Sequence, residues 1–294
     1  MKKSLHRRLQ IRLSGHGVPM SRSSWYAAAA LAALTFAATA SAAPLHVSRD
    51  LDERITSVAL NGDVHARVIL PANYDDLPHR RYPVIYFLHG LPADSSAYRG
   101  NTWLADAMAN VGPAILVLPQ GARDQDTDPE YLNWGSGRNW ENYIARELPH
   151  YIDAHFRTIR SPAGRAIVGL SAGGYGATIV GLHHPGTFSV IESWSGYFHP
   201  TDPTGTQPLA RGPAANAHTL LGGLRSRSTF FAFYVGSGDN RFLAENQQLN
   251  RELVAAHVSH VFEVYAGKHE TVLWQSHALT WLRLALKHLA APTR

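Results

Sequence analysis

A serine at the centre of Gly169-Leu170-Ser171-Ala172-Gly173 has the surroundings of a catalytic nucleophile. The apolar run 165–168 precedes it, long enough for one buried strand and too short for a helix. The small-residue segment 174–183, which follows, has helical character. Such a strand, turn and helix form a nucleophile elbow, in which glycines two residues either side of the serine leave room for the bend. The pattern therefore predicts a serine hydroxyl exposed at a helix N-terminus, where free N–H groups favour negative charge.

A serine hydroxyl attacks a carbonyl group only when a neighbouring base takes its proton. Two residues that could complete this chemistry follow other predicted strands: Asp239 follows strand 230–235, and His269 follows strand 261–265. Their order along the chain, Ser, Asp, His, is that of an α/β-hydrolase triad. In such a triad the neutral imidazole accepts the serine proton, and the carboxylate fixes the tautomer and stabilises the imidazolium. The sequence thus predicts Ser171, Asp239 and His269 as catalytic residues.

Other residues compete for these roles. Glu245, one turn into the predicted helix after Asp239, and Asp202 are alternative acids. His277 is an alternative base, although it falls within a predicted helix rather than at a strand end. His89 also follows a strand, and we expect it to support its loop rather than to act as a base. The preference for Asp239 and His269 rests on position, since the working residues of a parallel sheet gather beyond the carboxyl ends of its strands.

The segment His89-Gly90-Leu91 follows the predicted strand 83–88. In an α/β-hydrolase the loop after this strand donates one N–H to the oxyanion hole, beside the N–H of the residue that follows the nucleophile. The predicted oxyanion donors are therefore the backbone amides of Leu91 and Ala172. One such donor contributes about 3–4 kcal/mol to stabilising the transition state.

Strands and helices alternate along the chain, which predicts an α/β fold with a mostly parallel central sheet and helices on both faces. A hairpin is predicted first, from two β-rich runs joined by Asn61-Gly62-Asp63. The remaining predicted strands are 83–88, 114–118, 165–168, 188–194, 230–235 and 261–265, and the predicted helices are 103–110, 139–156 with Asn139 as N-cap and a kink at Pro149, 174–183, 240–257 and 271–289.

Two loop segments call for separate interpretations. The segment 197–227 is rich in proline, glycine and threonine and has almost no apolar periodicity, so we expect it to cover the site as a lid. Asp124, Asp126 and Asp128 alternate in the loop 123–138, but Pro129 and Gly135 stand where a calcium loop needs glycine and glutamate. We therefore expect a solvated loop, no metal site and no cofactor.

The composition, with 17% charged and 45% hydrophobic residues, is that of a globular protein. The net charge of +5 comes from six basic residues before residue 44, and the remaining chain holds 21 basic and 22 acidic residues. A nearly neutral body argues against nucleic acid as a partner. The absence of cysteine excludes disulfides, a thiol nucleophile and a lipoprotein anchor.

The basic N-terminal segment precedes an apolar, alanine-rich run, 25–40, which ends in the small-residue pattern Ala40-Ser41-Ala42. These are the parts of a signal peptide. We therefore expect residues 1–43 to be a leader, residues 44–294 to form one esterase domain, and the mature protein to be secreted or periplasmic without stable membrane insertion. Met20 is an alternative start, Arg7-Arg8 is compatible with a twin-arginine signal, and a non-cleaved anchor is the competing interpretation.

Six segments between about residues 55 and 289 resemble the putative-esterase family, which includes S-formylglutathione hydrolases, feruloyl esterases and mycolyltransferases. They are PVIYFLHG, NWENYIARELPHYID, GLSAGGYGA, HHPGTF, YVGSGD and AGKHETVLW. The resemblance implies an α/β-hydrolase with Ser171, Asp239 and His269 as its triad. The function expected is an exported serine carboxylic-ester hydrolase acting through an acyl-serine on a small-molecule or carbohydrate ester. An acyltransferase of the mycolyltransferase type, an S-formylglutathione hydrolase-like thioesterase and a binding protein without activity are the alternatives. The sequence identifies neither substrate-binding residues nor an oligomeric state.

Overall fold

Strands β1 (Arg49–Ser57) and β2 (Gly62–Leu70) pair antiparallel and form the hairpin predicted around Asn-Gly. Asn61 has a φ of 51°, in the left-handed region that asparagine adopts more readily than most residues. The computed structural model describes residues 49–200, 212–224 and 229–294. The predicted leader therefore lies outside the described residues, and so does Asp202.

The sheet has eight strands in the order β1-β2-β4-β3-β5-β6-β7-β8. Strand β2 pairs antiparallel with β4, and every pairing from β4 through β3 to β8 is parallel. The strands beyond the hairpin are β3 (Val84–Leu88), β4 (Ile115–Pro119), β5 (Arg165–Leu170), β6 (Val190–Trp194), β7 (Phe230–Gly236) and β8 (Val261–Tyr265). The predicted mostly parallel sheet is confirmed, and because the strands are parallel, their carboxyl ends meet at one edge.

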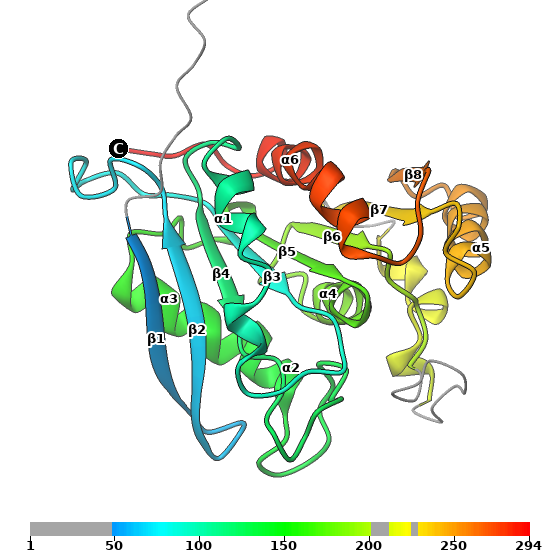
Figure 1. Ribbon diagram of the computed structural model, residues 1–294, viewed down its shortest axis with the longest axis horizontal. Coiled ribbons are helices and arrows are strands. Elements are labelled where there is room, and N and C mark those ends of the chain that lie inside the picture. The colour runs from blue at the N-terminus through cyan, green and yellow to red at the C-terminus, as the bar shows by residue number, and fades with distance from the viewer. Residues whose placement is uncertain (1–48, 201–211, 225–228) are drawn as a thin grey trace, which may run out of the picture. The chain divides into compact units, whose positions relative to one another are not determined.

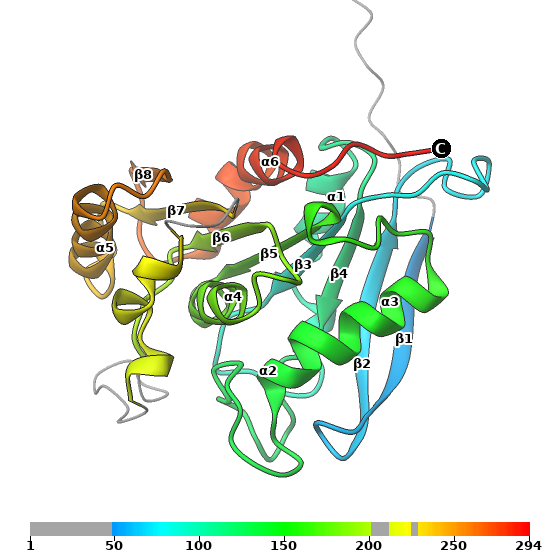
Figure 2. The same ribbon diagram turned by 180° about the vertical axis from the view of Figure 1, so that it is seen from behind.

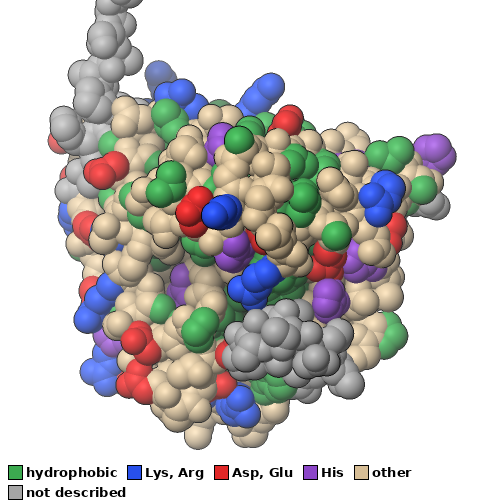
Figure 3. Space-filling model, turned by 45° about the vertical axis from the view of Figure 1, so that its right-hand side comes forward, with side chains coloured by type: hydrophobic (Ala, Val, Ile, Leu, Met, Phe, Trp, Pro, Cys, Tyr) green, Lys and Arg blue, Asp and Glu red, His purple; other side chains and the backbone are tan. Residues whose placement is uncertain are grey.

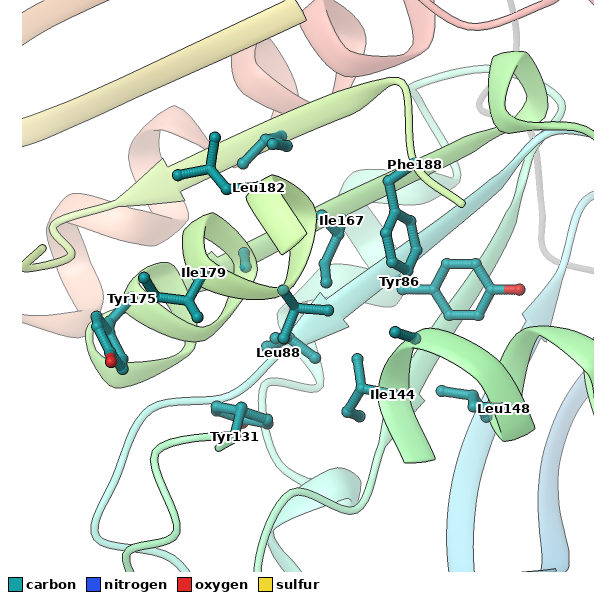
Figure 4. Packing of buried hydrophobic residues seen from close by; sticks show 14 of the residues in the cluster. Tyr86, Leu88, Tyr131, Ile144, Leu148, Ile167, Tyr175, Ile179, Leu182 and Phe188 are labelled. Atoms are coloured by element: carbon teal, nitrogen blue, oxygen red, sulfur yellow. The ribbon is translucent and has the colours of Figure 1, made fainter. Parts of the chain in front are cut away.

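Helices cover both faces of this sheet, and each strand divides its side chains between them. Val84, Tyr86 and Leu88 of β3 belong to one hydrophobic cluster, whereas Ile85 and Phe87 belong to the other. The second cluster includes residues of α1 (Trp103–Met108) and α6 (Thr271–Lys287), which lie in front of the sheet in Figure 1. The first includes α3 (Leu148–His155), α4 (Ala172–His183) and α5 (Leu243–Ala255), and α3 and α4 face the viewer in Figure 2. In Figure 4, Leu88, Ile144 and Ile179 lie within this first cluster.

The predicted helix 139–156 is a composite of three parts. Helix α2 (Trp140–Asn142) leads into a π-helical turn, Tyr143–Glu147, and then into α3. Proline has no N–H to donate to the carbonyl four residues earlier, and its ring collides with that carbonyl group. The wider π-helical turn just before Pro149 accommodates the proline ring. The helix begins where predicted, with Asn139 as its N-cap residue. The Asn139 side chain makes no capping hydrogen bond, and its Oδ1 instead accepts from the N–H of Gly135.

The described parts of the predicted lid, 197–200 and 212–224, include buried residues. Phe198 and Ala217 are fully buried in the first cluster, and the Tyr175 hydroxyl donates to the carbonyl of Ala215 at 2.7 Å. These parts belong to the fold itself. The rest of the segment lies outside the described residues, so the lid stays a prediction.

The loop 123–138 folds around a buried aspartate. Asp126 accepts hydrogen bonds from the Arg138 side chain and the Trp140 indole, each at 2.7 Å. Among the described residues, no three His, Asp or Glu side chains are grouped so as to hold a metal ion. Across residues 49–200, 212–224 and 229–294, no helix has both the length and the apolar character of a membrane span.

Candidate active site

Ser171 lies on a sharp turn between β5 and α4, with a φ of 55° and a ψ of −123°. This backbone conformation is unfavourable for a residue with a side chain and marks a position that the surrounding structure must hold in place. Gly169 and Gly173, which flank the turn, have no room for a side chain. A Cβ on Gly169 would lie 2.1 Å from the Gly173 carbonyl oxygen, and a Cβ on Gly173 would lie 2.1 Å from that of Leu88. The strand, turn and helix predicted around Ser171 are therefore present, and their geometry explains the glycines.

The structure brings Ser171, Asp239 and His269 into one line of hydrogen bonds. Asp239 follows β7, and His269 lies between β8 and α6. The distance from His269 Nε2 to Ser171 Oγ is 2.8 Å, and from His269 Nδ1 to Asp239 Oδ2 it is 2.7 Å. An ionised carboxylate only accepts, so the proton of a neutral imidazole lies on Nδ1, and Nε2 is left to accept the serine proton.

The second oxygen of Asp239 is bonded to the backbone. Oδ1 accepts from the N–H groups of Arg241 and Phe242, each at 3.2 Å, and Asp239 is only 1% exposed. A close contact joins its loop to the loop of His269, since the Gly238 N–H donates to the Gly267 carbonyl at 2.7 Å. The carboxylate is therefore held in one orientation, with one oxygen directed at the imidazole.

Two aromatic rings flank the imidazole of His269. The Phe242 and Trp274 rings each lie 5.1 Å from it, at interplanar angles of 67° and 88°. Edge-to-face packing of this kind fixes a ring without using its nitrogen atoms. The sequence analysis missed both residues. The only signal available was their position, three residues after Asp239 and five after His269.

The alternative acid and base lie in other interactions. Glu245 accepts from the Phe198 N–H at 3.0 Å and from His199 and His218. Burial would raise the pKa of Glu245, but the hydrogen bonds from the two histidines outweigh it and lower that pKa. His277 is stacked on Tyr265, with ring centroids 3.6 Å apart. Neither residue takes the place of Asp239 or His269 beside Ser171.

His89 is buried and both of its ring nitrogens are bonded to backbone. Nδ1 lies 2.9 Å from the Gly90 carbonyl oxygen and must donate to it, while Nε2 accepts from the Gly121 N–H at 3.0 Å. Burial lowers the pKa of His89, which favours the neutral ring. The Tyr131 hydroxyl donates to the His89 carbonyl at 2.6 Å and fixes the same loop. These bonds agree with a supporting role for His89.

The groups predicted for the oxyanion hole border the nucleophile. Ala172 is the first residue of α4, so its N–H has no acceptor within the helix. Leu91 lies in the wall of the cleft that contains Ser171 and His269, which measures about 350 Å³. A Cβ on Gly90 would lie 3.2 Å from the Cβ of Ser171, so this loop approaches the nucleophile closely. The cleft is lined by His89, Gly90, Leu91, Pro92, Ala93, Ala97, Gly100, Asn101, Leu170, Ser171, Arg241, His269 and Trp274.

Most aromatic residues close in sequence to the site do not line the cleft. Tyr131, Trp194, Tyr197 and Phe198 are instead buried in the core, with at most 4% exposure. Trp134 is partly buried and packs against the first cluster. The aromatic side chain in the cleft wall is Trp274 of α6. The apolar periodicity of the sequence placed this residue in the closing helix and gave it no role in the site.

Comparison with protein families agrees with this geometry. The sequence model of the family described as putative esterase matches residues 57–282. The chain belongs to the putative-esterase family. The match extends over β2 to β8 and includes the three residues of the hydrogen-bonded line, so the resemblance predicted from the six segments is confirmed.

Individual relatives are similar over part of their length. An esterase of Mycobacterium tuberculosis is 32% identical over 144 residues, which cover 49% of this chain and 31% of that protein. The diacylglycerol acyltransferase/mycolyltransferase Ag85C of Mycobacterium avium is 31% identical over 143 residues, 45% of this chain and 38% of that protein. The chain thus matches about a third of the length of these curated relatives.

Among solved structures, a ferulic acid esterase has a TM-score of 0.68 at 22% identity, covering 82% of this chain and 98% of that one. The S-formylglutathione hydrolase FrmB of Staphylococcus aureus has a TM-score of 0.64 at 19% identity, covering 80% and 98%. At these identities the likeness concerns the fold. It confirms the predicted α/β-hydrolase fold.

Proposed function

We propose that this protein is a serine carboxylic-ester hydrolase in which Ser171 is the nucleophile, His269 the general base and Asp239 the residue that orients the base. The observation that carries the proposal is the unbroken line of hydrogen bonds of 2.7 and 2.8 Å from Asp239 through His269 to the serine on the elbow. Membership of the putative-esterase family supports the same chemistry.

In the first half of the reaction, Ser171 Oγ attacks the ester carbonyl carbon while its proton passes to His269 Nε2. The carbonyl oxygen becomes an oxyanion and accepts hydrogen bonds from the N–H groups of Leu91 and Ala172. The intermediate collapses, the bond to the alcohol oxygen breaks, and the alcohol leaves with the proton from Nε2. The acyl group then remains on Ser171.

In the second half, water enters the cleft and gives its proton to Nε2 as its oxygen attacks the acyl carbon. Collapse of this intermediate releases the carboxylic acid and returns the proton to Ser171. Asp239 keeps the same hydrogen bond throughout and stabilises the imidazolium that forms in each half. No step requires a metal or cofactor.

An acyltransferase would differ only in the second half, where an alcohol replaces water. The similarity to a diacylglycerol acyltransferase/mycolyltransferase makes this the second candidate. Product analysis with and without an added acceptor alcohol separates the two activities, because transfer yields a new ester and hydrolysis yields the free acid.

We further propose that residues 1–43 are a cleaved leader and that the protein is exported. The basic segment and the apolar run that ends in Ala40-Ser41-Ala42 support this. N-terminal sequencing of protein from the periplasm and the medium tests it. A mature N-terminus near Ala43 or Pro44 is expected, and an intact leader on cytosolic protein would contradict it.

The hydrolase proposal is tested with nitrophenyl, feruloyl and acetyl-sugar esters and the pure protein. We expect turnover of at least the activated esters and its loss in Ser171→Ala with unchanged circular dichroism. Equal turnover by the wild type and Ser171→Ala would overturn the proposal.

A further inference from the structure

One residue in the wall of the cleft carries a permanent charge. Of the residues that line the cleft in the described part of the chain, Arg241 is the only arginine or lysine, and none is an aspartate or glutamate. Asp239 lies behind His269 and is 1% exposed. A substrate bound against Ser171 therefore meets one cationic side chain and no carboxylate among these lining residues.

The position of Arg241 follows from the backbone that holds the triad. Its N–H donates to Asp239 Oδ1 at 3.2 Å, so residue 241 is fixed to the carboxylate that orients His269. The guanidinium carbon lies 4.8 Å from the centre of the Phe242 ring, and that ring lies 5.1 Å from the ring of His269. The guanidinium is thus one aromatic ring away from the proposed base.

Charged side chains of both signs occur together on one face of the molecule. On the face seen in Figure 3, Lys and Arg, Asp and Glu, and His side chains are interspersed. Residues 44–294 are also nearly neutral in sequence, with 21 basic and 22 acidic residues. A nearly neutral chain supplies little long-range attraction for an anion, so selection by charge is expected to come from groups in the cleft.

We propose that Arg241 binds an anionic group of the ester substrate, a carboxylate or a phosphate, and so gives the enzyme a preference for negatively charged esters. This inference rests on the proposed function and adds a substrate class to it. A guanidinium presents five N–H donors in a planar fork that matches the two oxygens of a carboxylate or phosphate. Contact with the Phe242 ring is compatible with this role, because arginine commonly combines an aromatic contact with hydrogen bonds at its edge.

Matched ester pairs test the proposal and show on which side of the ester bond the anion lies. 4-Nitrophenyl hemisuccinate against 4-nitrophenyl acetate adds a carboxylate to the acyl side. 4-Acetoxybenzoate against its methyl ester adds one to the alcohol side. The quantity measured is the anionic-to-neutral ratio of kcat/KM, compared between enzymes, so that the intrinsic reactivity of each ester cancels.

For at least one pair, Arg241→Gln should lower this ratio about fivefold to tenfold, mainly by raising KM for the anionic ester. Arg241→Lys should retain part of the preference, and Arg241→Glu should reverse it. Lys268→Gln is the matched control, because it removes one positive charge next to His269 from an exposed residue outside the cleft lining. Its ratio should stay within about twofold of the wild type.

A second measurement does not depend on any variant. The wild-type ratio should fall as salt rises from about 0.02 to 0.5 M, because a charge contact in an open cleft is screened. Unchanged ratios in Arg241→Gln for both pairs, or an equal fall in Lys268→Gln, would overturn the inference. Turnover of the neutral esters reports on the proposed function separately. Loss of the charge preference with neutral turnover intact leaves the hydrolase proposal standing.

Discussion

In the described part of the chain, carboxylate–imidazole pairs lie on the β1–β2 hairpin (His65 with Asp52), beside Ser171, beside α4 and beside α5. The pair beside Ser171 differs from those beside α4 and α5 in what the second ring nitrogen faces. His269 joins Asp239 through Nδ1 and meets the Ser171 hydroxyl through Nε2, in the wall of a cleft. His183 also joins a carboxylate, Glu141, through Nδ1 at 2.8 Å, but its Nε2 faces the Ala214 carbonyl oxygen at 2.9 Å. A carbonyl oxygen has no proton to give. The same kind of pair can therefore accept a proton from a hydroxyl in one place, whereas in the other it can only hold loops together.

The histidines beside α5 also join loops to a helix through carboxylates. His218 bridges two carboxylates, with Nδ1 bonded to Glu252 and Nε2 lying 3.3 Å from Glu245. His199 bonds Glu245 as well. These contacts attach the described parts of the segment 197–224 to α5. We name Glu141, His183 and His184 the α4 cluster, and Glu245, Glu252, His199 and His218 the α5 cluster.

The largest expected difference is between the bases. His269→Ala should lower kcat about 10⁴-fold or more, because residues of a triad act as a unit and the loss of one removes most of its effect. His183→Ala, in the α4 cluster, should change kcat less than about threefold, since that ring has no path to the nucleophile. Steady-state kinetics on a neutral ester, with circular dichroism as the folding control, measures both. Similar losses in the two variants would mean that His269 is not the base.

The acids should differ nearly as much as the bases. Asp239→Asn should keep the packing of the carboxylate but lose control of the imidazole tautomer, a defect of about 10⁴-fold in kcat in a known triad enzyme. Glu245→Gln, in the α5 cluster, should cost less than about tenfold in rate. It should instead lower the melting temperature, because a buried acceptor of charge-assisted bonds contributes about 1.5–3 kcal/mol to stability. If Glu245→Gln abolished activity and Asp239→Asn did not, the acid would be on α5.

The smallest effect concerns stability and its pH dependence in the α4 cluster. Burial would raise the pKa of Glu141, but hydrogen bonds from His183 and His184 outweigh it and lower that pKa from 4.5 to about 2. The hydrogen bond to Glu141 in turn raises the pKa of His183 above 6.5. A lowered carboxylate pKa gives stability that is present above about pH 4.5 and is lost as the pH falls toward 2. A raised histidine pKa gives stability that is present below about pH 6.5 and is lost as the pH rises through the folded-state value.

Both contributions to the free energy of unfolding are therefore fully present between about pH 4.5 and 6.5. Glu141→Gln should cost about 1–3 kcal/mol in the free energy of unfolding within this window and less outside it, with kcat nearly unchanged. Urea unfolding at several pH values measures the loss. A loss that is equal at every pH would show that the charge on Glu141 does not contribute.

The sequence was sufficient for the main strands and helices and for the hydrogen-bonded line of Ser171, His269 and Asp239, because each depends on local chemistry. The elbow needs glycines at 169 and 173, and strand ends locate Asp239 and His269. The sequence could not predict features that depend on contacts between distant segments. Phe242 and Trp274 flank His269 from two different helical regions, and nothing in their local pattern distinguishes them from core residues.

The π-helical turn before Pro149 was missed for a related reason. The sequence shows that Pro149 cannot donate a helical hydrogen bond. A kink and a wider turn can each accommodate this loss, and packing against the sheet decides which of them forms. The α4 and α5 clusters were missed because single histidine and glutamate residues in a sequence look like solvated residues. Only the fold brings them together across 27 to 46 positions.

The central claim is that the serine on the elbow is the one nucleophile activated by an imidazole. Labelling with a fluorophosphonate, followed by intact-mass and peptide mass spectrometry, tests it most directly, because the reagent traps an activated serine whatever the natural substrate. The account predicts one adduct per chain, on Ser171, which disappears in Ser171→Ala and is greatly slowed in His269→Ala, while Glu245→Gln labels at nearly the wild-type rate. An adduct that persists in Ser171→Ala, or that forms at the same rate without His269, would contradict it.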